Sequence, residues 1–471
     1  MRRAALRCRR RSTTRTALAR LAPALCWLAA LCIPPGAASN LELHARDGVP
    51  SLDTDHPAIV QYGLIIPRKA TWTHGREPKM KHSVTLLEVA PGQLLAAWFG
   101  GTWEGRPDTA IHTARYRDGQ WGEHRQIPKQ GKVPMWNPVL CAIPQANETL
   151  LFYKIGTRIP DWAGVVVRSH DSGRSWGRPV RLGELPHRLH ATGPVKNKCL
   201  LTHNGTLVAG TSREVRKPGA PDYATSVKWT VHIEYSHDRG HRWHRTRDIP
   251  FEGNIIQPAL FHDSDGNVRM VARHRGYASS PSSTFQKGHV VVAKSHSHDG
   301  LSEWEAFRET SLPCPNSGID AVRLADGRIL LIYNHSNRMK YAGRSIINAA
   351  LSYDDGETWR PVMTLDHSPD VVKEFSYPAV IQAADGLVHI SYTHSSKQVV
   401  TAKSGRENLR HIILDPTRLD LEYWRAVKLR GEYLEAVAGN AARRRQTVVV
   451  KAAAGVAQPP EAQAWEAALA G

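Results

Sequence analysis

Cysteine is scarce in this 471-residue chain, and half of it lies near the beginning. Three of the six cysteines fall within the first 38 residues, and the others are Cys141, Cys199 and Cys314. An odd trio at such wide spacing is typical neither of a disulfide framework nor of a zinc site. The histidine pair His296/His298 overlaps a repeated turn motif, and the pair His187/His190 is isolated. We therefore expect no metal and no cofactor.

Acidic residues are also few relative to basic ones. The chain has 43 Asp and Glu against 62 Lys and Arg, and a formal net charge of +19. Eight of these charges are arginines in the first 38 residues, and two more belong to the segment after residue 440, which leaves +9 for the body. Such a surplus suits an anionic ligand. No basic helix, RNA-binding aromatic signature or zinc finger accompanies it, which argues against nucleic acid as a partner.

Long hydrophobic runs are lacking apart from residues 21–33, which are short for the roughly 20 residues of a membrane span. This run follows an arginine-rich, acid-free start and precedes the small residues Gly36, Ala37 and Ala38. The arrangement is typical of a secretory signal peptide. A membrane anchor or an organellar leader remains the alternative over residues 1–38. We expect a secreted or extracytoplasmic protein with a body over 39–430 and a loosely ordered extension over 431–471.

What the chain does have is a repeated motif, Ser-x-Asp-x-Gly-x-x-Trp. Full copies occupy residues 169–176, 236–243 and 352–359, and a degenerate copy occupies 297–304. Ser and Asp side chains bond backbone amides in turns, Gly supplies a positive φ, and Trp packs on a neighbouring sheet. Recurrence at intervals of tens of residues indicates a repeat architecture.

A second repeat alternates with the first. Six segments contain an apolar run, a turn dipeptide and another apolar run, typical of β-hairpins. They cover residues 83–101, 137–156, 195–214, 256–276, 319–336 and 377–396. Trp-ended turns follow at Trp121, Trp176, Trp243, Trp304 and Trp359, with Trp424 a possible sixth. About sixty residues per unit predict an all-β fold, a six-bladed β-propeller with four-stranded antiparallel blades. A β-sandwich is the alternative.

In a propeller, residues before the first strand and after the second strand of each blade meet at one mouth of the central channel. The Trp-ended turns lie at the opposite face. This rule selects a largely polar set of candidates: His82, Glu104, Asp108, Trp136, Lys196, Asn197, Lys198, Glu214, Gln257, Arg273, Arg275, Asn316, Asp320, Asn334, Glu374 and Tyr377.

The boxes resemble the Asp boxes of the sialidase (neuraminidase) superfamily. Six further segments resemble its sialidase-like branch with bacterial neuraminidase repeats: 97–108, 136–140, 193–198, 255–258, 315–320 and 375–382. The resemblance covers about residues 80 to 416. It implies a retaining exo-glycosidase without a metal, in which three arginines bind the sugar carboxylate, an Asp is the general acid/base, and a Glu activates a nucleophilic Tyr.

Carried over by position, the resemblance implies that Tyr377 is the nucleophile and Arg344 the third arginine. Arg273 or Arg275 matches the second arginine. Asp108 matches the general acid, and Glu104 competes with it.

Two positions depart from the family pattern. His82 stands where the first arginine is expected, and Gln257 stands where the activating Glu is expected. An amide cannot accept the phenol's proton. Glu214 or Glu374 are possible substitutes, and Lys196, Lys198, Arg273 and Arg275 could supply a positive field.

The expected function is that of a sialidase-like exo-glycosidase that releases a terminal acidic sugar, sialic acid or a relative, from a glycan. A polysaccharide lyase or other glycosidase acting on uronates is one alternative, and a non-catalytic glycan-binding propeller is another. The expected partner is a glycan, and the protein is expected to be a monomer. Asn147, Asn204 and Asn334 are glycan acceptors only on a eukaryotic secretory route.

Overall fold

A computed structural model describes ten stretches of the chain. They are residues 56–67, 70–129, 131–185, 189–216, 227–251, 253–275, 288–337, 343–368, 372–399 and 405–420. The predicted leader, the C-terminal extension and Trp424 lie outside these residues. No helix among the described residues is long and apolar enough to span a bilayer.

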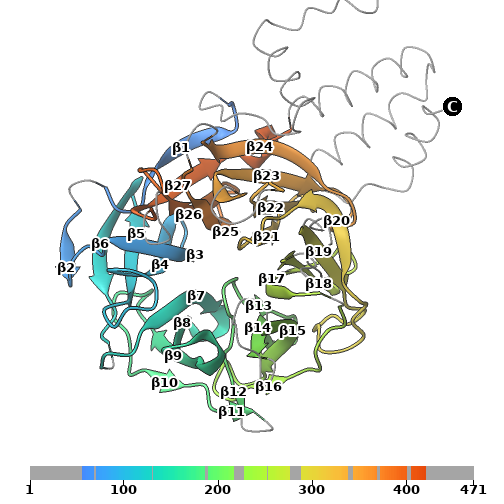
Figure 1. The fold of residues 1–471 in the computed structure, drawn as a ribbon, viewed down its shortest axis with the longest axis horizontal. Helices are drawn as coiled ribbons and strands as arrows, with labels where there is room; N and C mark the ends of the chain where they lie inside the picture. Colours follow the sequence, from blue (N-terminus) through green and yellow to red (C-terminus); the bar gives the residue numbers. More distant parts are fainter. Residues whose placement is uncertain are drawn as a thin grey trace, which may run out of the picture. The chain divides into compact units, whose positions relative to one another are not determined.

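The described residues form six four-stranded antiparallel blades arranged in a ring, as predicted (Figure 1). Blade I has β3 (Met80–Ala90), β4 (Gln93–Gly101), β5 (Ala110–Arg117) and β6 (Gln120–Gln126), and β2 (Trp72–His74) joins β6 in parallel. Blade II has β7 (Met135–Ile143), β8 (Glu148–Ile155), β9 (Ala163–Ser169) and β10 (Val180–Arg181). Blade III has β13 (Leu200–Leu201), β14 (Leu207–Arg216), β15 (Val227–Ser236) and β16 (His244–Arg245).

The second half of the ring repeats this order. Blade IV has β17 (Ile255–His262), β18 (Val268–His274), β19 (His289–Lys294) and β20 (Arg308–Pro313). Blade V has β21 (Asp320–Arg323), β22 (Ile329–Tyr333), β23 (Ile346–Ser352) and β24 (Arg360–His367). Smaller elements are the hairpin β11 (Glu184–Leu185) and β12 (Leu189–His190), and the 3₁₀ turns η1 (Pro144–Ala146), η2 (Ile159–Asp161) and η5 (Pro416–Arg418).

Blade VI closes the ring with strands from both ends of the described chain. It has β25 (Phe375–Gln382), β26 (Val388–His394) and β27 (Asn408–Leu414), and its outer strand is β1 (Ile59–Leu64). Ile59 pairs with Leu414 and Leu64 with Arg410 in the antiparallel ladder. The last blade therefore takes its fourth strand from the region preceding blade I.

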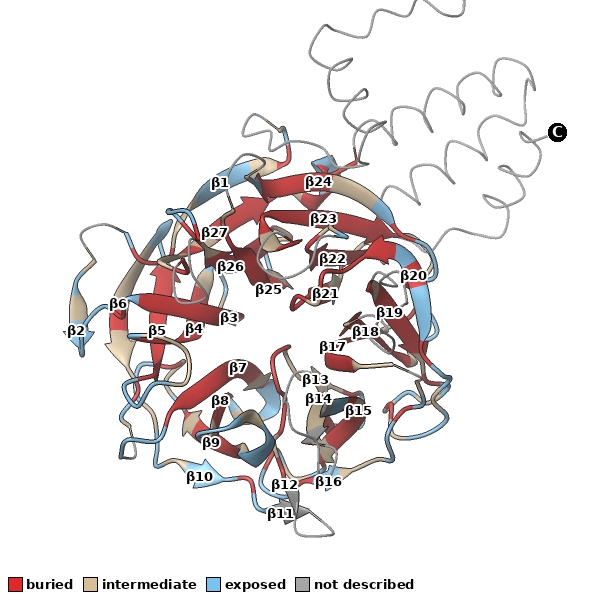
Figure 2. Cartoon of the chain, viewed as in Figure 1, coloured by how far each residue is buried: buried red, intermediate tan, exposed pale blue. Residues whose placement is uncertain are grey.

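The hydrophobic core consists of layers between neighbouring blades. One cluster joins blades I and II through residues such as Phe99 and Tyr153, and another joins blades V and VI through residues such as Ile347 and Tyr392. Figure 2 shows the inner strands largely buried and the outer edges exposed. Each Å² of apolar surface that two neighbouring blades remove from water stabilises their packing by about 25 cal/mol.

The Trp-ended boxes join the third and fourth strands of their blades. In the box at 169–176, Ser169 Oγ accepts from the Gly173 amide at 2.8 Å, and Asp171 Oδ1 accepts from the Ser175 amide at 2.8 Å. The boxes at 236–243 and 352–359 repeat the serine–glycine bond at 2.8 Å. Trp243 then packs edge-on against Phe152 of the preceding blade. The predicted structural role of the boxes is confirmed.

Most blades have a left-handed residue within a few positions of the start of their inner strand. Such residues are Ser83, Asn137, Gln257, Asn316 and Tyr377, with φ of 55°, 37°, 57°, 58° and 54°. In β3, β7, β17 and β25 the ladder register shifts at this point. A bulge of this kind bends the strand and redirects a side chain. The mouth of the ring is therefore the strained part of the inner strands.

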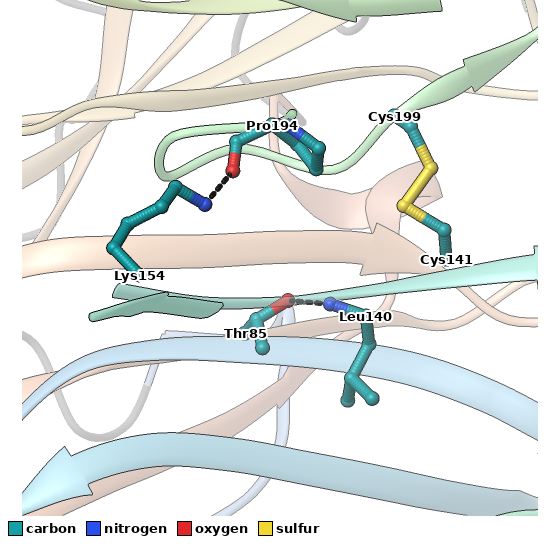
Figure 3. Close-up of a disulfide and its surroundings, with 6 residues drawn as sticks. All are labelled: Thr85, Leu140, Cys141, Lys154, Pro194 and Cys199. Carbon is teal, nitrogen blue, oxygen red and sulfur yellow. Dashed lines mark hydrogen bonds between the residues drawn. A yellow bond between two sulfur atoms is a disulfide. The ribbon is translucent and has the colours of Figure 1, made fainter. Parts of the chain in front are cut away.

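One disulfide corrects the interpretation of the cysteines. Cys141 of β7 is bonded to Cys199, just before β13, with the two Cα atoms 5.9 Å apart (Figure 3). Cys314 is a buried free thiol. The pair is 58 residues apart in sequence, but adjacent blades bring the two positions together.

The box geometry predicts unequal effects of two serine substitutions. Ser169→Ala leaves the buried Gly173 amide without an acceptor and is expected to destabilise the fold by about 1–3 kcal/mol. Ser175→Ala removes an exposed hydroxyl and is expected to cost under about 1 kcal/mol. Urea unfolding of both variants measures the difference, and equal losses would contradict a structural role for the Ser169 bond.

Candidate active site

Tyr377 lies at the centre of the candidate site. Its Oη accepts a hydrogen bond of 2.8 Å from Arg273 Nη1, which comes from β18 of blade IV. The Arg273 and Arg344 guanidinium carbons lie 5.5 and 5.4 Å from the centre of the tyrosine ring. The His82 ring, from blade I, lies 4.2 Å from it. The structure thus brings together four predicted residues from four blades.

Glu374 is fully buried next to Tyr377 and is bound by two arginines. Its Oε1 accepts from Arg344 Nη1 at 2.9 Å, and its Oε2 accepts from Arg406 Nε at 2.8 Å. Burial alone would raise the pKa of this carboxyl, but Arg406 and Arg344 outweigh it and hold the pKa well below its usual range. Glu374 is therefore a permanent carboxylate that neutralises two guanidinium groups.

Arg406 is a member of the site that the sequence did not indicate. Its Nη1 donates to Glu104 Oε2 at 2.7 Å, and its guanidinium lies 5.4 Å from the Trp103 ring. It stands two residues before β27, as Arg344 stands two residues before β23. That equivalent position in consecutive blades is the signal that would have identified it. Through Arg406, Glu104 of blade I joins the cluster.

His82 is a neutral imidazole in this setting. Its Nδ1 lies 2.8 Å from Thr393 Oγ1, and the residue is buried. Burial is the main cause that lowers its pKa well below the usual value, and the nearby Arg406 lowers it further. His82 can therefore not substitute for a cationic arginine near pH 7.

Asp108 makes no described contact with the Tyr377 cluster. Its Oδ2 accepts from the backbone N and the Oγ1 of Thr102, at 2.7 and 2.5 Å. It lines a separate hollow with Arg76 and Lys129. Partial burial raises the pKa of Asp108, but the bonds from Thr102 outweigh it and lower the pKa. Of the two candidates for the general acid, Glu104 is the one in contact with the arginine cluster.

Gln257, Glu214 and Arg275 form the border of the site. Gln257 and Glu214 line a common cleft between blades II, III and IV. The Oε1 of Gln257 is buried and has no hydrogen-bond partner among the described residues. The Arg275 guanidinium lies over the Trp229 ring at 5.3 Å, and that of Arg273 lies over the same ring at 5.7 Å. Neither Glu214 nor Gln257 has a described bond to the Tyr377 hydroxyl.

Lys196, Asn197, Lys198 and Asp320 meet near the axis of the ring. Lys196 Nζ donates to the Ile319 carbonyl at 2.9 Å, to Asn197 Oδ1 at 2.8 Å and to the Pro378 carbonyl. Lys198 Nζ contacts both carboxylate oxygens of Asp320 at 2.9 and 3.0 Å. Burial lowers the pKa of Lys196 to about 7. These predicted residues bond to one another and to segments of other blades, and none of them bonds the Tyr377 hydroxyl among the described contacts.

Asn316, Asn334 and Trp136 also make structural contacts. The Asn316 carbonyl accepts from Arg344 Nη2 at 3.2 Å. Asn334 is fully buried, and its Nδ2 donates to the Phe375 carbonyl at 2.7 Å, which leaves that nitrogen closed to a glycan in the folded protein. Trp136 Nε1 donates to the Gly156 carbonyl at 2.8 Å.

Within the described ranges, no group of three or more His, Cys, Asp and Glu side chains is arranged to hold a metal ion. The residues gathered around Tyr377 offer guanidinium groups, carboxylates, a phenol and a neutral imidazole. Such a set can bind an anion and move protons.

A family model described as a BNR repeat-like domain matches residues 92–390. The chain belongs to this BNR repeat-like family. The predicted resemblance to proteins with bacterial neuraminidase repeats is thereby confirmed. No curated protein matches the sequence.

Solved structures similar to this BNR repeat-like protein share its fold at low identity. A protein of unknown function from Dyadobacter fermentans has a TM-score of 0.57 and 17% identity, with 76% of this chain and 98% of that chain covered. A Hadza microbial sialidase has a TM-score of 0.53 and 15% identity, with 72% of this chain and 66% of the sialidase covered. The sialidase of Trypanosoma rangeli has a TM-score of 0.56 and 13% identity, with 79% of this chain and 62% of the sialidase covered. The chain thus spans less than two thirds of the length of either sialidase.

The buried carboxylate predicts a large stability loss in one variant. Glu374→Gln leaves buried Arg344 without its carboxylate and Arg406 with Glu104 alone, and is expected to destabilise the protein by about 3–5 kcal/mol. Glu104→Gln is the matched control, because its side chain is 35% exposed and Arg406 keeps Glu374; about 1 kcal/mol or less is expected. Denaturant unfolding tests this, and similar losses would contradict the central place of Glu374.

A second buried lysine predicts a pH dependence. Lys154 is fully buried, and burial lowers its pKa from 10.5 to about 7. Between these values the unfolded chain holds a proton that the folded chain has lost, so folding stability rises with pH. Lys154→Met should reduce this rise by up to about 1.4 kcal/mol per pH unit. Urea unfolding of both proteins at pH 7, 8 and 9 measures the slopes, and identical slopes would refute the shift.

Proposed function

We propose that this protein is a sialidase-like exo-glycosidase that releases a terminal acidic sugar, sialic acid or a relative, from glycans. The observation that carries the proposal is that Arg273 and Arg344 both contact Tyr377, while Arg406 is joined to Arg344 through the buried carboxylate of Glu374. Solved sialidases share the fold, and one of them, from Trypanosoma rangeli, is in complex with sialic acid.

The arginines are suited to bind the sugar's carboxylate. A guanidinium group has five N–H donors in a planar fork that matches a carboxylate. Arg273, Arg344 and Arg406 each use one or two of these donors on described residues. The donors that remain can bind an incoming carboxylate. Glu374 neutralises part of the charge and keeps Arg344 and Arg406 in place.

Tyr377 is the proposed nucleophile and Glu104 the proposed general acid. The donor bond from Arg273 stabilises negative charge on the phenol oxygen as its proton passes to the neutral imidazole of His82, whose ring lies against the tyrosine ring. The phenol oxygen then forms a bond to the anomeric carbon as the bond to the leaving oxygen breaks, and Glu104 protonates the leaving oxygen. Water later displaces Tyr377, and Glu104 accepts a proton from that water. His82 returns the phenol's proton to the phenolate when water displaces it from the sugar. In this proposal Glu104, next to Arg406, has the role that Asp108 has by sequence position.

A lyase is the second candidate, and the contact between His82 and Tyr377 favours it. A neutral imidazole can accept a proton, and His82 lies against the tyrosine ring. Removal of the proton next to a uronate carboxylate, followed by loss of the leaving oxygen, gives an unsaturated product. This product absorbs ultraviolet light, whereas a hydrolysis product does not.

We also propose that the protein acts outside the cytoplasm. The Cys141–Cys199 disulfide supports this, because disulfides persist mainly in oxidising compartments. The arginine-rich start of the sequence supports the same route.

Two variants test the proposed hydrolase. Tyr377→Phe and Arg344→Ala are each expected to lower sugar release by about 1000-fold or more. Tyr377→Phe should keep the stability of the wild type, whereas Arg344→Ala removes a charge partner of buried Glu374 and should also lower stability. Release from a panel of sialylated and uronate-bearing glycans is followed by mass spectrometry, with circular dichroism as the folding check. Ser175→Ala, on the opposite face, is the control. Full activity of Tyr377→Phe would exclude this mechanism, and glycan binding without release by the wild type would indicate a binding propeller.

A further inference from the structure

The segment that leads into β13 of blade III reaches β25 of blade VI, which carries Tyr377. Lys196 is 2% exposed, and its Nζ donates to the carbonyl of Pro378, the residue that directly follows Tyr377. The same ammonium donates to the Ile319 carbonyl of the segment entering blade V. One side chain therefore connects three blades at the residue that follows the candidate nucleophile.

A second contact connects the same two segments. Lys198 binds the carboxylate of Asp320, and Asp320 Oδ2 accepts from the backbone N of Val380 at 2.9 Å. Residues 196 and 198 thus hold β25 one and three positions after Tyr377. The bond from Lys196 is direct, whereas the bond from Lys198 passes through Asp320.

The stem of Lys196 also lies close to the tyrosine ring. A methyl group placed on Gly318 would lie 3.1 Å from Lys196 Cε and 3.2 Å from Tyr377 Cγ. The lysine and the tyrosine therefore pack around the same glycine. A larger residue at 318 would have to displace one of them.

Tyr377 needs such support because its backbone is strained. A non-glycine residue at φ of 54° costs roughly 1–3 kcal/mol and persists only where the surroundings impose it. The bond from Lys196 to the Pro378 carbonyl holds the Pro378–Ala379 peptide, one residue beyond Tyr377. Without it, the tyrosine can relax towards an ordinary strand conformation.

The segment that carries Lys196 is itself anchored. Cys199 is bonded to Cys141 of blade II, and Lys154 of the same blade donates to the Pro194 carbonyl (Figure 3). Asn197 Nδ2 donates to the Gln257 carbonyl at 3.0 Å. Blades II and IV therefore fix the segment from both sides.

We propose that Lys196 is the positioning residue for Tyr377: it holds the phenol in line for attack through the Pro378 carbonyl and does not touch the substrate. This role rests on the proposed function of Tyr377. A displacement of about 1 Å from the reactive geometry can lower a rate by about 100-fold. Loss of Lys196 should therefore slow the reaction more than it weakens binding.

The test compares Lys196→Met with Arg328→Met. Arg328 is a matched control, because it is also a buried cation that donates to a proline carbonyl, that of Pro416, at 2.8 Å. This contact lies outside the Tyr377 cluster. In Lys196→Met, kcat for sugar release should fall by about 100-fold, with KM changed by less than about threefold. In Arg328→Met, stability should fall while kcat stays within about twofold of the wild type.

A second measurement does not need activity. Hydrogen–deuterium exchange of the peptide covering residues 375–382 should increase at least tenfold in Lys196→Met and stay at the wild-type level in Arg328→Met. If Lys196→Met fails to fold, Lys196→Gln, which retains an amide donor, takes its place. The fall in kcat and the rise in exchange of residues 375–382 should then be smaller.

The outcomes separate the two proposals. A wild type that binds or ignores every glycan without release overturns the proposed function, and the exchange measurement alone then decides whether Lys196 positions Tyr377. Sugar release by the wild type, with kcat lowered equally in both variants, overturns the role of Lys196 and leaves the proposed function intact. Unchanged exchange of residues 375–382 in Lys196→Met overturns it as well.

Discussion

The buried carboxylate of Glu374 is the interaction on which the candidate site depends. A charge removed from water must be paired, and here one carboxylate pairs with two guanidinium groups. Arg344 comes from the loop before β23 of blade V, and Arg406 from the loop before β27 of blade VI. Arg406 extends the network to Glu104 of blade I. Two carboxylates and two guanidinium groups thus connect loops of three blades, and one of these loops contacts the Tyr377 ring through Arg344.

The same rule acts at the axis of the ring. The inner strands enter it through left-handed residues, and this strain is tolerated because side chains of other blades bond to the adjoining peptides. Asn137 donates to the Val195 carbonyl, and Asn197 to that of Gln257. Side chains of blades II and III thus donate hydrogen bonds to backbone carbonyls of the blade that follows. The apolar layers between blades hold the ring together, and the polar contacts determine where its reactive groups lie.

The sequence predicted the blades because each one is specified locally. Box and hairpin residues contact neighbours a few positions away, so their spacing is visible without a structure, and Tyr377 and Arg273 follow from hairpin ends. Contacts between blades have no such signature. The pairing of Glu374 with arginines rather than with the phenol, the separation of Asp108 from the cluster, and the Cys141–Cys199 bond all depend on which loops the ring brings together. Arg406 was missed because the rule was applied to the start of the loop after β26 and not to its end.

The closure of blade VI has a consequence for the order of assembly. About 350 residues separate β1 from its partner β27. At a synthesis rate of about 5–20 residues per second, the strand made first waits on the order of 20–70 s for the strand it must join. During that time its unpaired edge is a site where another chain could add. The exposed Val60 and Tyr62 lie on this strand. The ribosome therefore finishes five blades before the first strand can take its place in the sixth.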